Sequence, residues 1–79
     1  MELVELTKFL VTELLPDVDV EVKSHNEEGM HVIQVLVPEG NMSKLIGKGG
    51  SIANSIRTIV QASAYIKKLG KVRINIDVK

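Results

Sequence analysis

Apolar residues recur every three or four positions near the start of the chain and again in its second half. The first pattern covers residues 2–15, with leucines at positions 3, 6, 10 and 14, and predicts an amphipathic helix that ends at Pro16. The second covers residues 51–68 and predicts a longer helix that Gly70 terminates. Between them, Asn41 is placed to cap a short helix over residues 42–46.

Three other segments have the patterning of strands. Val18, Val20 and Val22 alternate with charged residues, and residues 72–78 repeat this alternation after the last helix. Residues 30–37 carry apolar side chains on both faces, as expected for the middle strand of a sheet. A turn is expected at residues 26–29, and residues 38–40 end the hairpin.

The predicted order of elements is α-β-β-α-α-β, in one α+β domain over residues 1–79. Strands joined by a helical crossover lie parallel, so residues 30–37 and 72–78 should pair in parallel, with the first strand antiparallel beside the middle one. This arrangement is a three-stranded mixed sheet covered on one face by helices. A chain of 79 residues builds one modest core but no enzyme cleft between two lobes.

A glycine-rich basic turn joins the last two predicted helices. Gly47, Gly49 and Gly50 lack the Cβ atoms that would hold a nucleic-acid backbone at a distance, and they permit positive φ angles. The next helix begins near Ser51 and directs its free N–H groups and the positive end of its dipole at the turn, while Lys48 adds a full charge. The pattern predicts a turn that binds the phosphates of an extended polyanion.

Two other glycine motifs are excluded by their spacing. A Walker A loop needs four residues between its glycines, but six separate Gly40 from Gly47. A dinucleotide fingerprint that starts at Gly47 would place Ile52 at its third glycine. A purely structural link between two helices remains the alternative interpretation of the turn.

The segment from Leu45 to Ile52 resembles the I-G-x-x-G-x-x-I signature of the KH domain, an RNA-binding module. With residues 56–60 behind it and 79 residues in all, the chain is similar over its full length to the small bacterial single-KH proteins of the KhpA family. The resemblance implies the type II KH topology, in which the extra helix and strand precede the core. Ser51 stands where these proteins usually carry a basic residue, so one phosphate contact fewer is implied.

The resemblance also implies how RNA binds. KH modules clamp about four nucleotides of single-stranded RNA with the GxxG backbone and lay the bases in a shallow apolar groove. The clamp here would be Gly47, Lys48, Gly49 and Gly50. Further RNA-binding candidates around it are Lys44, Ile46, Ser51, Asn54, Ser55, Arg57 and Thr58. Candidate groove walls are Ile33, Val35, Ile46 and Ile52.

The two halves of the chain carry opposite charges although the net charge is zero. Residues 1–40 hold nine acidic residues and two lysines, for a charge of −7, whereas residues 41–79 hold eight basic residues and one acid, for +7. Local potential, not net charge, attracts a polyanion. We therefore expect the C-terminal half to face RNA and the acidic half to face away.

Other function classes find little support. His25 and His31 flank a turn without a third ligand nearby in sequence, so no metal site is expected. We expect no cofactor, no small-molecule substrate and no enzymatic activity. The absence of cysteine and of any long apolar run predicts a cytoplasmic protein that does not cross a membrane.

Aromatic content is low: Phe9 and Tyr65 are the only residues among phenylalanine, tyrosine and tryptophan. One copy should therefore bind RNA weakly. We therefore expect a homodimer, with Ile59 at the interface of equivalent helices, or a complex with another RNA-binding protein. The resemblance implies a larger KH-containing partner like KhpB and an RNA chaperone role tied to cell-wall growth and cell shape. The alternative is a protein-interaction subunit that keeps the fold for dimerisation while RNA binding is vestigial.

Overall fold

The computed structural model describes residues 2–79 and confirms the predicted α+β architecture. Its elements are α1 (Leu3–Leu14), β1 (Glu21–Glu27), β2 (Met30–Val37), α2 (Met42–Ile46), α3 (Ser51–Ile66) and β3 (Val72–Val78), with 3-10 turns at Glu39–Asn41 and Lys48–Gly50. The sheet order is β1-β2-β3, with β1 antiparallel and β3 parallel to β2. This is the order of the type II KH fold.

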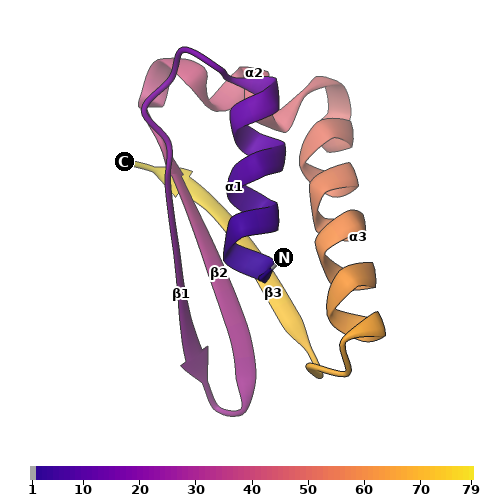
Figure 1. Cartoon of the computed structure of the whole chain (residues 1–79). Coiled ribbons are helices and arrows are strands. Elements are labelled where there is room, and N and C mark those ends of the chain that lie inside the picture. The colour runs from indigo at the N-terminus through magenta and orange to yellow at the C-terminus, as the bar shows by residue number, and fades with distance from the viewer. Residues whose placement is uncertain (1) are drawn as a thin grey trace.

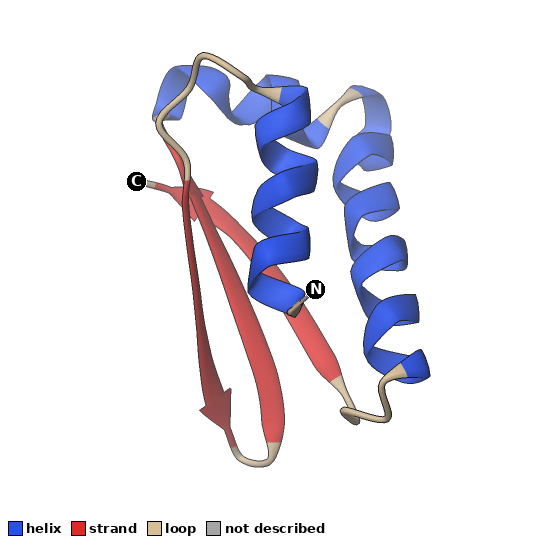
Figure 2. Ribbon diagram, in the orientation of Figure 1, coloured by secondary structure: helices blue, strands red, loops and turns tan. Residues whose placement is uncertain are grey.

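The helices cover one face of the sheet. Figure 1 and Figure 2 show α1 and α3 side by side on one side of the strands, with α2 across the end where α3 begins. The core lies between these layers, where Ile33, Val35 and Val37 of β2 meet Ile56 and Val60 of α3. Leu3 and Val11 of α1 belong to the same cluster, so helices from both halves of the chain bury the central strand.

The buried face of α1 differs from the expected row of leucines. Leu3, Thr7 and Val11 are buried, whereas Leu14 is 44% exposed and Leu6 is only partly buried. The buried Thr7 hydroxyl donates a hydrogen bond to the Leu3 carbonyl at 2.7 Å, which satisfies its polar group without an outside partner. The leucine spacing identified the helix but not the side that packs.

Strand β1 begins and ends later than predicted. Val18 and Val20 lie in the connection before it, where their side chains still pack partly buried against the core. The register pairs Glu27 with Met30, so a two-residue turn suffices, and Glu28 and Gly29 have φ angles of 51° and 80°. Such a turn matches the twist of its strands and lets all of β1 pair with β2, from Met30 to Leu36.

Helix α3 also ends earlier than predicted, at Ile66 instead of residue 68. Lys68 has a φ of 58°. Its N–H donates a hydrogen bond to the Tyr65 carbonyl, and the Leu69 N–H donates one to the Ala64 carbonyl. These paired bonds form a Schellman motif, whose left-handed position is usually glycine. The helix therefore closes on a lysine, two residues before Gly70.

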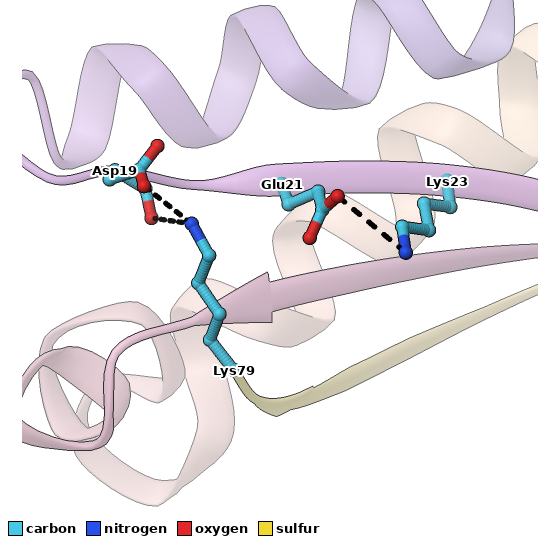
Figure 3. A network of polar contacts seen from close by, with 4 residues as sticks. All are labelled: Asp19, Glu21, Lys23 and Lys79. Carbon is cyan, nitrogen blue, oxygen red and sulfur yellow. Dashed lines mark hydrogen bonds and ion pairs between the residues drawn. The ribbon is translucent and has the colours of Figure 1, made fainter.

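An ion pair joins the C-terminal residue to the connection between α1 and β1. Lys79 extends the β3 pairing through its N–H to the Val37 carbonyl, and its Nζ lies 2.6 Å from Asp19 Oδ2 in the connection before β1 (Figure 3). A nearby pair, Glu21 and Lys23, lies within β1. The Lys79 ammonium holds the pKa of the Asp19 carboxyl below its ordinary value.

Candidate nucleic-acid interface

The turn between α2 and α3 has a backbone that favours glycine at three positions. Gly47, Gly49 and Gly50 have φ angles of 73°, 64° and 80°. A Cβ on Gly47 would lie 2.7 Å from Ile52 Cγ1, so the first glycine is also required by close packing. No atom comes within 4 Å of a Cβ placed on Gly49, which leaves open space above the middle of the turn.

The start of α3 faces this open space. Gly50 occupies the N-cap position in a left-handed conformation, and no side chain among residues 2–79 caps the helix. The N–H groups of its first turn and the positive end of its dipole therefore point at the turn. Lys44 and Lys48 are both exposed nearby, one on α2 and one within the turn. This arrangement can hold an anion against the backbone.

One detail of the KH signature differs from the sequence-based alignment. Counted from Ile46, the last position of I-G-x-x-G-x-x-I falls on Ala53, which is buried, and not on Ile52. Ile52 is partly buried and packs beneath Gly47. The small Ala53 side chain therefore takes the place in the core that the signature gives to isoleucine.

The predicted polar contacts divide between two sides of α3. Asn54 and Arg57 lie toward β3, and Arg57 Nη1 donates to Asn54 Oδ1 at 3.2 Å. Ser51 and Ser55 instead line a hollow between α1 and α3, and the Ser55 hydroxyl donates to the Ser51 carbonyl. The Thr58 hydroxyl is likewise used within the helix, on the Asn54 carbonyl. Only part of the predicted set can therefore meet one ligand.

An open groove of about 960 Å³ runs between α3 and β3. Its lining residues are Met30, Arg57, Gln61, Tyr65, Ile66, Lys68, Gly70, Lys71, Val72, Arg73 and Ile74. Four of them are cationic and none is acidic, so the groove favours a negatively charged guest.

Sequence reasoning found only Arg57 among these lining residues. Gln61 and Tyr65 follow Arg57 at intervals of four, a spacing that marks one side of a helix. That signal was present in the sequence. What was missing was the knowledge that this side of α3 faces the free edge of the sheet.

Two side chains of α3 cover the backbone of the edge strand. Arg57 Nε donates to the Ile74 carbonyl at 3.2 Å, and Gln61 Nε2 donates to the Val72 carbonyl at 3.4 Å. β3 pairs with β2 on one side only, so its outer polar groups have no strand partner. Guanidinium, amide and backbone groups thus gather along the groove, where they could bond the edges of bases.

The expected groove walls are partly wrong. Ile33 and Val35 are fully buried beneath the helices, so neither contributes to the surface of the groove. Ile46 is 38% exposed beside the turn, and Ile52 is partly buried, so these two remain candidates for the wall.

The hollow on the other side of α3 is smaller and apolar. Besides the two serines, it is lined by Leu10, Glu13, Leu14, Ile52, Ile56 and Ile59. Ile59 is 46% exposed, whereas its neighbour Val60 is fully buried. A side chain of this size at the surface of a helix is suited to an apolar contact.

The remaining surface offers no sign of other chemistry in the part of the chain that the structure describes. His25 Nε2 lies 3.3 Å from Glu27 Oε2, and residues 2–79 contain no group of three or more potential metal ligands. Across the same residues, no helix has both the length and the hydropathy of a membrane span.

Comparison with known proteins identifies relatives over most of the chain. The family model described as "KhpA/KhpB, KH domain" matches residues 4–78. RNA-binding protein KhpA of Caldanaerobacter subterraneus is 38% identical over 65 residues, which cover 81% of this chain and 87% of the relative. RNA-binding protein KhpA of Treponema pallidum is 38% identical over 47 residues, 60% of this chain and 59% of that relative.

Solved structures share the fold at low identity. Era in complex with MgGDPNP and nucleotides 1506–1542 of 16S ribosomal RNA matches with a TM-score of 0.66 at 18% identity. A variant of Aquifex aeolicus Era bound to GDP and AlF4⁻ matches with a TM-score of 0.64 at 15% identity. Each match covers 98% of this chain but 30% of the Era chain. The chain belongs to the KhpA/KhpB KH domain family, a family of RNA-binding proteins and not of enzymes.

Proposed function

We propose that this protein binds single-stranded RNA and that the turn from Gly47 to Gly50 clamps about four nucleotides. The observation that carries the proposal is the conformation of the turn, with three positive φ angles and open space beside an uncapped helix start. Lys48 and Lys44 supply charge beside that backbone. The two relatives named RNA-binding protein KhpA support the same ligand.

The groove between α3 and β3 provides a course for the bases. When the turn holds the phosphates of the RNA, the bases are free to follow α3 along its β3 side. There Arg57 and Gln61 offer N–H donors, and the carbonyls of Val72 and Ile74 offer acceptors once these side chains move. The cationic lining would attract the strand whatever its sequence.

The proposal extends to a physiological role. The resemblance to the KhpA family supports a cytoplasmic RNA chaperone that works with a larger KH-containing, KhpB-like partner in cell-wall growth and cell shape. One shallow groove and one clamp give weak affinity, so a second RNA-binding unit would raise the effective concentration of sites on the same strand.

A second candidate function is self-association or pairing with a related KH protein. The observation that favours it is the exposed side chain of Ile59, beside the exposed Leu14, at the rim of an apolar hollow. A two-fold contact between equivalent α3 helices would cover Ile59 in both copies. This surface lies on the other side of α3 from the groove, so dimerisation and RNA binding are compatible.

The RNA clamp is tested by placing negative charge in the turn. In the double variant Lys48→Asp/Gly49→Asp, both positions are exposed. A Cβ at Gly49 meets no neighbouring group within 4 Å, and aspartate is among the side chains that best tolerate the left-handed φ of 64° there. We expect affinity for single-stranded RNA, measured by fluorescence anisotropy, to fall about a hundredfold or more, because two carboxylates would face a phosphate.

The matched control is Lys23→Asp/Asn26→Asp. It makes the same change in net charge at exposed positions of β1, the strand at the far edge of the sheet from the groove. We expect this control to reduce affinity by about twofold at most, because salt screens distant charges. Unchanged affinity in the turn variant would overturn the clamp, whereas loss of its helical circular dichroism would indicate that the turn is structural.

A further inference from the structure

Tyr65 stands out among the residues of the groove. Its side chain is 84% exposed, yet the residue lines the same groove as Arg57 and Gln61. It lies in the last turn of α3, next to the residue that ends the helix. A large aromatic side chain left this open on the cationic side of a helix is available to a ligand.

The surroundings of Tyr65 are positively charged. Lys68 and Lys71 follow it around the end of the helix and line the groove with it, and Arg73 joins them from β3. Ile66, next in the chain, adds an exposed apolar side chain. An aromatic ring among cations, without an acidic residue in the same groove lining, is the composition of surfaces that stack bases of single strands.

This group lies far from the clamp. Tyr65 is fourteen residues after Ser51 in one continuous helix, which places it about 21 Å along the axis from the turn. Figure 1 shows the two ends of α3 at opposite ends of the sheet, with the turn at one end and the link to β3 at the other. An RNA strand bound at the turn must therefore extend along the length of the groove to reach Tyr65.

We propose that Tyr65 is a stacking platform for a base that lies beyond the nucleotides held by the turn, and that Lys68 and Lys71 neutralise the phosphates beside it. The proposal rests on the proposed RNA binding and deepens it. It assigns the protein a longer single-stranded footprint than the clamp alone, with two anchors at the ends of one groove. Short oligomers would occupy the clamp without contacting the ring, and longer ones would contact both.

The chain itself provides the probe for this contact. Tyr65 is its only tyrosine and it has no tryptophan, so intrinsic tyrosine fluorescence reports on this ring alone. We expect a single-stranded RNA of about ten nucleotides to quench that fluorescence and one of about four to bind without quenching it. N-acetyltyrosinamide with the same RNA corrects for absorption of light by the bases.

Affinity measurements complete the test. Tyr65→Ala should weaken binding of the longer RNA by roughly five- to tenfold and leave the shorter RNA unaffected, while Tyr65→Phe, which keeps the ring, should bind both normally. The matched control is Phe9→Ala, which removes the other exposed aromatic ring from α1, outside the groove. Neither exposed position carries the core, so both variants should keep the circular dichroism of the unmodified protein.

Each failure has a distinct meaning. If the longer RNA binds but leaves both the fluorescence and the Tyr65→Ala affinity unchanged, the stacking platform is wrong while the clamp stands. If Tyr65→Ala instead lowers the mass measured by light scattering without RNA, the ring serves contact with a second copy and the proposal is overturned. If neither RNA binds the unmodified protein, RNA binding itself is wrong and the platform with it.

Discussion

The two sides of α3 present opposite chemistry. On the β3 side, Arg57 and Gln61 bond the carbonyls of an edge strand and line a cationic groove. On the α1 side, Ile59 and Leu14 leave apolar surface around a small hollow. The difference follows from the neighbours, because a sheet edge offers unpaired polar groups whereas a packed helix offers aliphatic side chains.

This comparison gives each candidate function its own surface. RNA binding belongs to the turn and the β3 side, and protein contact belongs to the α1 side. The two functions can therefore be separated by substitutions on one helix, a few residues apart, without changing the core between them.

On the groove side, the largest effect expected after that of the charged turn variant is the response of RNA binding to salt. With about two to four phosphates neutralised, log affinity should fall with log salt at a slope of roughly −1.5 to −3, or roughly 8- to 60-fold between about 50 and 200 mM. Arg57→Ala should make the slope shallower by under about one unit if the guanidinium meets a phosphate. Ser55→Ala, on the α1 side, should leave it unchanged, and equal slopes for all three proteins would exclude a phosphate contact by Arg57.

A charge on the α1 side should separate assembly from RNA contact. Ile59→Asp places a carboxylate in the proposed apolar contact, so light scattering should report a folded monomer, with RNA affinity reduced several-fold through lost avidity. Thr12→Asp adds the same charge at an exposed position of α1 that does not line the hollow, and it should keep the assembly. A monomer for the unmodified protein across micromolar concentrations would refute self-association and leave the clamp untouched.

A smaller effect is expected at Lys68, which lines the groove and also holds the left-handed position that ends α3. Lys68→Gly removes a side chain from a left-handed position with φ of 58°, where glycine is favoured. Urea unfolding should show a gain of about 0.5–1 kcal/mol, because relief of strain exceeds the added freedom of the unfolded chain. Affinity for the longer RNA should fall by roughly threefold or less, since one cation leaves the groove. Lower stability would contradict the Schellman assignment.

The smallest effect concerns the ion pair between Asp19 and Lys79, which lies outside both surfaces. Lys79 lowers the pKa of Asp19, so the pair contributes stability above the ordinary aspartate pKa of about 3.9, and that contribution is lost as pH falls through the lower pKa of the folded state. Asp19→Asn should therefore lower the melting temperature slightly at neutral pH and not at about pH 2. Asp17→Asn, in the same connection, is the control, and a constant difference at every pH would contradict the linkage.

Much of the fold could be predicted from local patterns. The order of six elements, the mixed sheet and the glycine turn all follow from periodicity and turn chemistry within short windows. The errors lay at the ends of elements, which hydrogen bonds define. β1 extends to Glu27 because β2 offers partners that far, and α3 ends before Lys68, where the N–H groups of Lys68 and Leu69 bond the last carbonyls of the helix.

The sequence by itself determined which residues share a helix or a strand, and it identified the turn, because glycine spacing and side-chain periodicity are local properties. Only the tertiary structure decided how each helix is rotated about its axis. That rotation buries Thr7 and exposes Leu14, and it turns Arg57 toward β3 and Ser55 toward the hollow beside α1. The physical reason is that a helix with apolar residues around much of its surface has several possible packing faces, and contacts with distant segments select one.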